Sequence, residues 1–104
     1  MSTAPGVSAD AIIGVLRAHE PELRQAGIRH LSVFGSVARG DATAESDVDL
    51  AAELRPDAGI GLLWLAAIER RLGEILGCTV DLLAEPVEKP RLRARIDRDR
   101  QRAF

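Results

Sequence analysis

Apolar residues along this 104-residue chain form strand-like runs in some stretches and keep helical spacing in others. Apolar runs bounded by glycine or proline predict β-strands, and apolar residues that recur every three or four positions predict amphipathic helices. Three stretches fit the first pattern, and the strongest helical pattern lies between the second and the third. The predicted strands cover residues 29–34, 48–54 and 78–84.

Helical patterns occupy most of the chain around these strands. Ser8 stands where an N-cap is expected, before an apolar stripe, and Pro21 opens a short helix ahead of the first strand. The pattern over 62–76 is the strongest, because its apolar residues keep helical spacing for about four turns. Pro90 opens a last helix that we expect to continue through Arg102.

This order of elements predicts a single α/β (α+β) domain over residues 1–104, with a small mixed β-sheet and helices packed on it. The link between the first two strands is thirteen residues long, so it allows either an antiparallel or a parallel pair. We expect residues 1–7 to be flexible and 88–104 to form a basic C-terminal helix.

Composition is that of a globular protein and disfavours several classes of function. The chain is 46% hydrophobic and 29% charged, and its net charge of −2 gives no overall attraction to nucleic acid or to an anionic membrane. Aromatic residues make up only 3%, which argues against base stacking, so direct nucleic-acid binding is not expected. The single cysteine, Cys78, and the lack of a secretory or membrane-spanning pattern predict a cytoplasmic protein.

The stretch FGSVARGDATAESDVDL, residues 34–50, is where candidate chemistry begins. Gly35 follows the first strand directly, and Ser36 is placed to start a short helix that ends at Gly40. A helix start offers free backbone N–H groups, and a glycine lets a phosphate approach the backbone closely. Arg39 is either a further phosphate contact or a solvent-facing arginine. On its own, such a stretch is more often an ordinary turn with a helix cap.

Three aspartates supply the second part of the pattern. Asp47 and Asp49 are two residues apart, so in a strand they share one face while Val48 points into the core. Carboxylates held together repel one another, and Mg²⁺ is commonly bound by such carboxylates together with substrate phosphates. A solvated strand edge would explain this pair alone, but Asp81 stands between apolar residues of the third strand. If the second and third strands are neighbours, the three carboxylates meet on one face, as in two-metal phosphoryl transfer.

These residues also occur in a recognisable order. They are Gly35, Ser36, Asp47, Val48, Asp49 and Asp81, with ten residues between the serine and the first aspartate. In this order they resemble the nucleotidyltransferase superfamily that includes DNA polymerase beta, and they are more closely similar to its minimal nucleotidyltransferases, often called MNT proteins. The resemblance runs over residues 28–84 and implies a polymerase beta-like nucleotidyltransferase fold.

The resemblance implies a role for each of these positions. Gly35 and Ser36 would hold the triphosphate of ATP. Asp47 and Asp49 would bind two Mg²⁺ ions, and Asp81 would complete the metal site and help to deprotonate the acceptor hydroxyl. The acceptor oxygen would then attack the α-phosphorus in line, and pyrophosphate would leave.

The resemblance also implies a partner. Minimal members similar to this chain are typically antitoxins encoded with a HEPN-domain toxin, a helical RNase, which they silence by transferring AMP from ATP to a tyrosine. Two alternatives stay open. One is an antitoxin that neutralises its toxin by binding alone, although a pure binding module has no evident use for clustered carboxylates. The other is transfer to a small molecule of the aminoglycoside type.

The C-terminal segment holds half of the positive charge of the chain. The whole chain has fourteen lysine and arginine residues. Seven of them are in this segment, namely Lys89, Arg91, Arg93, Arg95, Arg98, Arg100 and Arg102. A solvated helix is one interpretation. The other is a docking surface for an acidic partner or for nucleotide phosphates, with Leu92 and Ile96 as its apolar anchor.

Overall fold

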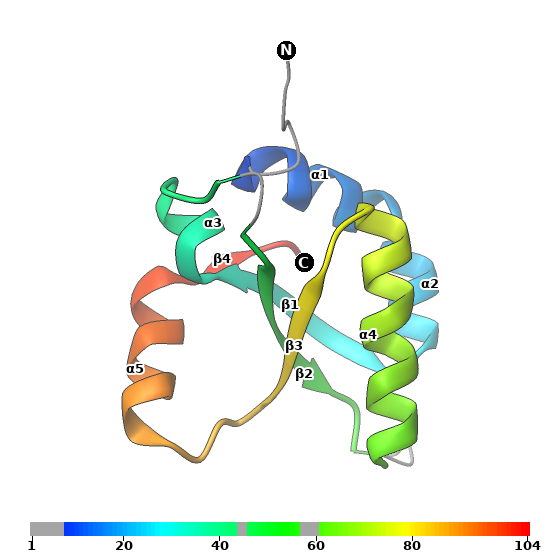
Figure 1. The fold of residues 1–104 in the computed structure, drawn as a ribbon. Helices are drawn as coiled ribbons and strands as arrows, with labels where there is room; N and C mark the ends of the chain where they lie inside the picture. The colour runs from blue at the N-terminus through cyan, green and yellow to red at the C-terminus, as the bar shows by residue number, and fades with distance from the viewer. Residues whose placement is uncertain (1–7, 44–45, 57–60) are drawn as a thin grey trace.

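A computed structural model describes residues 8–43, 46–56 and 61–104 of the chain (Figure 1). Helices and strands alternate along these residues. In chain order they are α1 (Ala9–Ala18), α2 (Glu20–Gln25), β1 (Ile28–Phe34), α3 (Gly35–Arg39), β2 (Val48–Leu54), α4 (Leu62–Leu76), β3 (Val80–Glu85), α5 (Pro90–Asp99) and β4 (Gln101–Arg102). The predicted flexible start, residues 1–7, lies outside the described residues. None of the helices in the described ranges is long and apolar enough to cross a membrane.

The strands form one mixed sheet in the order β3-β2-β1-β4. β1 is antiparallel to both β2 and β4, whereas β2 and β3 are parallel. A parallel pair needs a long crossover, and α4 supplies it between β2 and β3. The predicted small mixed sheet with helices packed on it is therefore confirmed.

Helices cover both faces of this sheet. α1, α2 and α4 lie over one face with the larger core beneath them, and α5 lies over the other (Figure 1). Alternation along β2 explains the two cores, because Val48 and Leu50 point into the larger one and Ala51 points into the smaller. In the smaller core, Ile96 of α5 packs with Phe34 and Ala51, and this contact fixes α5 across the sheet.

Local signals in the sequence account for most of the helix ends. Ser8 caps α1 as predicted, since its Oγ accepts a hydrogen bond from the amide of Ala11 at 3.4 Å. Gly77 follows α4 in the left-handed conformation, with φ of 71°, and ends the helix where the sequence predicts. β2 and α4 have the predicted bounds. β3 begins at Val80, two residues later than predicted, because the turn after Gly77 delays the start of pairing.

The last helix is shorter than predicted, and this is a correction. It ends at Asp99 and not at Arg102, because Arg100 adopts an extended conformation with φ of −54° and ψ of 127°. The two residues that follow pair as β4 with the open edge of β1. An open edge offers unpaired backbone groups, and the chain end uses them, since the amide of Ala103 donates to the carbonyl oxygen of Leu31 at 2.8 Å and the amide of Leu31 donates to that of Phe104 at 3.2 Å. The basic segment 88–104 is thus a helix followed by an edge strand.

The packing of α5 predicts a large loss of stability when its anchor is shortened. Ile96 is 1% exposed, and Ile96→Ala should lower the free energy of unfolding by about 2 to 4 kcal/mol, since the cavity lies between a helix and a sheet. Chemical denaturation measures the change. As a control, Leu62→Ala should alter stability by less than about 0.5 kcal/mol, because Leu62 is 87% exposed. Equal losses in the two variants would contradict the assignment.

Candidate active site

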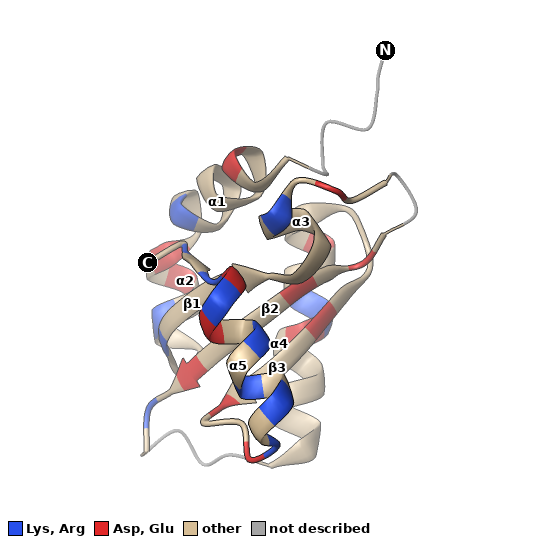
Figure 2. Cartoon of the chain, turned by 90° about the vertical axis from the view of Figure 1, so that its left-hand side faces the viewer, with Lys and Arg blue, Asp and Glu red and all other residues tan. Residues whose placement is uncertain are grey.

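Two aspartates lie side by side at one end of the sheet. β2 and β3 pair in register, and Asp49 is the direct partner of Asp81. Both side chains point to the α5 face, because their neighbours Val48, Leu50 and Leu82 point into the larger core. Figure 2 shows acidic positions on β2 and β3 beside basic positions on α5. The second and third strands are neighbours, so the condition stated for a shared carboxylate face is met, and the expected outward direction of Asp81 is confirmed.

Gly35 stands directly beneath the Asp49 carboxylate. A Cβ atom added at Gly35 would overlap Oδ2 of Asp49, so the carboxylate would have to move aside. The glycine also has φ of 76°, in the left-handed region that costs other residues about 1 to 2 kcal/mol. The backbone conformation favours glycine here, and the absence of a side chain leaves the Asp49 carboxylate its present position beside the turn after β1.

Asp47 lies just before β2 and is exposed. Its charge acts on Asp49, as does that of Asp81. Burial raises the pKa of Asp49 above its ordinary value of 3.8, and the two neighbouring carboxylates raise it further. Arg95 and Arg39 act in the opposite direction. The three aspartates therefore form one electrostatic cluster in which the half-buried Asp49 is the central member.

α3 begins at Gly35 and brings backbone N–H groups to the same place. Its N-cap is Phe34, which makes no side-chain cap bond, so the interpretation of Ser36 as an N-cap is not the arrangement adopted. The first N–H groups of a helix have no partner within it, which leaves them free for an acceptor such as a phosphate oxygen. Within the described part of the chain, the Ser36 side chain makes no hydrogen bond either, and it is half-buried.

Arg39 is held in place by two carboxylates. Its Nη1 donates to Oδ2 of Asp99 at 2.9 Å, and its Nε donates to Oδ2 of Asp41 at 3.3 Å. The hydrogen bonds to Asp99 and Asp41 raise the pKa of Arg39, while those from Arg98 and Arg39 lower the pKa of Asp99. The guanidinium is partly exposed, so it keeps room for a further anionic ligand.

Two contributors to this site have no counterpart in the sequence motif. Asp99 is 60 residues away from Arg39, yet its side chain is only 4% exposed and binds that guanidinium. Arg95 acts on Asp49 from α5. The helical period identifies Ile96 as a buried position, so its neighbour Arg95 is expected at the edge of the packed face. Only the tertiary structure shows which strand lies beside Arg95.

The cluster fits a divalent cation by charge and by ligand type. Carboxylate oxygens are the ligands that Mg²⁺ prefers, and a cation would relieve the repulsion between Asp49 and Asp81. Across residues 8–43, 46–56 and 61–104, no three carboxylate, imidazole or thiolate side chains are close enough to hold an ion by themselves. Mg²⁺ usually takes only one or two carboxylates and completes its shell with water and substrate phosphates. The residues therefore suit an ion that binds together with a nucleotide.

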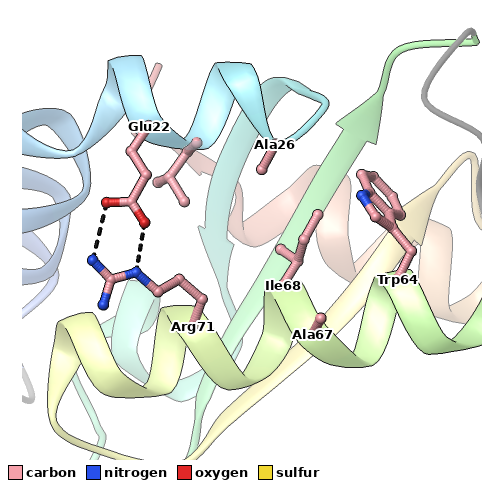
Figure 3. Close-up of a pocket in the computed structure, with 7 residues that line it drawn as sticks. Glu22, Ala26, Trp64, Ala67, Ile68 and Arg71 are labelled. Atoms are coloured by element: carbon pink, nitrogen blue, oxygen red, sulfur yellow. Dashed lines mark hydrogen bonds and ion pairs between the residues drawn. The ribbon is translucent and has the colours of Figure 1, made fainter.

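A separate apolar pocket lies on the other side of the sheet and is not part of this cluster. It has a volume of about 250 Å³ between α2 and α4, and Figure 3 shows its lining. Glu22 and Arg71 close one end with a double ion pair, in which Nη2 of Arg71 donates to Oε1 of Glu22 at 3.0 Å. Trp64 and Ile68 form much of its wall. The carboxylate and the guanidinium of this lining are thus already paired with each other, which leaves a mostly apolar surface hollow without evident chemistry.

Comparison with known proteins agrees with this geometry. The family model described as nucleotidyltransferase domain matches residues 16–103. The protein adenylyltransferase MntA of Thermococcus cleftensis is 39% identical over 75 residues, which cover 71% of this chain and 74% of the relative.

Solved structures share the fold. A protein provisionally assigned as a minimal nucleotidyltransferase superposes with a TM-score of 0.74 at 32% identity, covering 90% of this chain and 94% of the other. A chain from the complex of a tri-AMPylated HEPN toxin of Shewanella oneidensis with an MNT antitoxin gives a TM-score of 0.64 at 15% identity. It covers 88% of this chain and 71% of that one, and at this identity the likeness concerns the fold alone.

The contact between Gly35 and Asp49 predicts that Gly35→Ala is damaging for two separable reasons. The strained φ should cost about 1 to 2 kcal/mol of stability, and the added methyl group should displace the Asp49 carboxylate. Gly40→Ala is the matched control, because Gly40 has φ of 83° but nothing within 4 Å of an added Cβ. Thermal melts and Mg²⁺-dependent ATP binding measure the two effects. Only Gly35→Ala should abolish binding, and equal binding by both variants would contradict the role of the contact.

The repulsion in the cluster predicts that Asp81→Asn stabilises the metal-free protein. The folded state holds the Asp49 proton more tightly than the unfolded chain, so stability falls as pH rises from 3.8 through the raised pKa. Removing the facing charge should therefore add a few tenths to about 1 kcal/mol at pH 7 in the presence of EDTA. Denaturant midpoints at pH 7 and pH 4 test this, and the gain should shrink at pH 4. A gain of the same size in Glu88→Gln, an exposed loop position, would instead indicate a general charge effect.

Proposed function

The chain belongs to the nucleotidyltransferase domain family, and from this premise we propose that it transfers AMP from ATP to a hydroxyl group of a partner protein. The observation that carries the proposal is the pairing of Asp49 with Asp81 directly over the Gly35 turn. That arrangement combines paired carboxylates with free backbone donors, which are the two requirements of magnesium-assisted phosphoryl transfer. This is the family that the order of the sequence motif resembles.

Each residue of the cluster takes a definite part in the proposed reaction. Asp47, Asp49 and Asp81 would hold two Mg²⁺ ions, and magnesium supplies Lewis-acid stabilisation of the charge on the phosphate oxygens when it is bound. The N–H groups of Gly35 and Ser36 orient the triphosphate so that its α-phosphorus lies beside the carboxylates.

Proton transfer and charge balance complete the reaction. The exposed Asp81 accepts the proton of the acceptor hydroxyl, whose oxygen attacks the α-phosphorus as the bond to pyrophosphate breaks. Arg39, kept in position by Asp99, meets the negative charge of the leaving phosphates. Because the pKa of Asp49 is raised in the metal-free protein, lowering the pH should protonate Asp49 and weaken Mg²⁺ binding at a higher pH than for an ordinary aspartate.

We propose a HEPN-domain toxin as the partner and one of its tyrosines as the acceptor, so that this chain acts as a cytoplasmic antitoxin. Two findings support the choice of partner. The relative from Thermococcus cleftensis is named a protein adenylyltransferase, and the complex from Shewanella oneidensis contains an AMPylated HEPN toxin beside an MNT antitoxin. AMP on a tyrosine adds bulk and negative charge at the modified site, which is an effective way to silence an enzyme that binds RNA.

The decisive experiment is the intact mass of a co-expressed HEPN-domain partner before and after treatment with ATP and Mg²⁺. The wild-type protein should add one or more AMP groups. Asp47→Asn and Asp49→Asn should each slow the transfer at least about a hundredfold, because each removes a carboxylate that holds the metal ions and the phosphates.

Glu88→Gln is the control for a lost carboxylate away from the cluster and should transfer as fast as wild type. If the aspartate variants still neutralise the toxin in cells and no mass is added by the wild type, the chain acts by binding alone. Transfer to an aminoglycoside without any protein partner would instead support a small-molecule acceptor.

A further inference from the structure

α5 presents two different flanks beside its buried face. Leu92 and Ile96 pack against the sheet, and a turn of 100° per residue places the remaining long side chains on either side of them. One flank carries Arg93, Asp97 and Arg100. The other flank carries Arg91, Arg95 and Arg98, which we call the arginine stripe.

The first flank is anchored to the protein. Nε of Arg93 donates to the carbonyl oxygen of Val87 at 3.0 Å. Nη1 of Arg100 donates to Oγ of the buried Ser32 at 3.1 Å and to Oε1 of Glu85 at 3.0 Å. The arginines of this flank therefore have structural partners that hold the end of β3 and the loop after it against α5.

The arginine stripe is on the side of the aspartate cluster. The charge of Arg95 opposes the rise in the pKa of Asp49, so it lies within electrostatic reach of that carboxylate. In the described part of the chain, Arg91 and Arg95 make no hydrogen bond or ion pair, and Arg98 bonds to Oδ1 of Asp99 at 3.1 Å. All three are exposed. Figure 2 shows the basic positions of α5 next to the acidic positions of β2 and β3.

We propose that the arginine stripe docks an extended acidic segment of the protein that accepts the nucleotide. This proposal rests on the proposed function for the identity of the acceptor as a protein. It gives α5 a second role besides packing. By binding acidic residues that neighbour the acceptor hydroxyl in the partner chain, α5 would bring that hydroxyl to the carboxylates.

The spacing of the stripe favours an extended peptide. Arg91 and Arg95 are four residues apart, which is about 6 Å along the helix axis, and Arg98 follows after about 4.5 Å. Alternate residues of an extended chain repeat every 6 to 7 Å, so two acidic residues at alternate positions would match the step from Arg91 to Arg95. Arginine pairs with carboxylates through two parallel N–H donors, which suits this contact.

The position of the stripe separates it from the expected place of the triphosphate. Gly35, Ser36 and Arg39 are in α3, at the end of the site where α3 meets α5. Arg39 reaches the C-terminal end of α5, where it binds Asp99. The stripe extends from there toward the start of α5 by about 10 Å, which is away from α3. Arg91 and Arg95 are therefore free to meet a different ligand.

Binding of a fluorescein-labelled peptide of alternating glutamate and tyrosine, followed by anisotropy without ATP, tests the proposal. The double variant Arg91→Gln, Arg95→Gln should weaken this binding about three- to tenfold, as expected for two exposed charge pairs. The single variant Arg91→Gln, which keeps Arg95 and its charge beside Asp49, should weaken peptide binding about two- to threefold and leave the Kd for ATP with Mg²⁺ within about twofold of wild type. Arg70→Gln is the matched control, because Arg70 is an exposed helix arginine on the opposite side of the sheet and should leave peptide binding unchanged.

Any other combination of peptide-binding and ATP-binding results overturns the proposal. If ATP binding weakens and peptide binding does not, the arginines bind phosphates. If a labelled single-stranded RNA binds in place of the peptide, the stripe recognises nucleic acid. No peptide binding by wild type, or equal binding by wild type and the double variant, would make the stripe a solvated surface. The assay contains no transfer step, so its outcome is independent of whether AMP transfer occurs.

Discussion

Repulsion between two carboxylates on adjacent parallel strands is the constraint on which this site depends. Asp49 and Asp81 are partners in register, and the partial burial of Asp49 weakens the screening of their repulsion by water. A protein keeps such a pair only if other contacts hold the strands together. Here the opposite face of the same residues does so, because Val48, Leu50 and Leu82 are buried in the larger core. The hydrophobic face of the sheet thus offsets the electrostatic cost of its functional face.

The same two strands carry a second pair of carboxylates in register four residues later, and its surroundings differ from those of the aspartates. Glu53 is the register partner of Glu85, just as Asp49 is the partner of Asp81. Glu85 binds the guanidinium of Arg100, and Glu53 is 3.7 Å from that of Arg29. Among the described residues, the aspartate pair has no such ion pair. One pair is neutralised and the other is not, and this difference supports the proposed metal site at the aspartates, whereas the glutamates have structural partners.

How much of this could be read from the sequence depends on the range of the interactions. Strand alternation and glycine turns are local, so β2, α4 and the outward face of Asp81 were predictable. β4 was not, because a two-residue strand exists only by pairing with the edge of β1, and the same is true of the early end of α5.

The contacts that complete the site were out of reach for the same reason. The bond from Arg39 to Asp99 joins residues 60 positions apart, and no spacing rule connects them. Likewise, the helical period places Arg95 beside a buried position, but the choice of flank follows from how Ile96 docks on Phe34 and Ala51. α5 therefore contacts both ends of the candidate site, because Asp99 holds Arg39 and the charge of Arg95 acts on Asp49. Arg95 and Asp99 follow the last residue of the motif, Asp81, by 14 and 18 positions, so the local motif and its tertiary support are separate requirements of the candidate site.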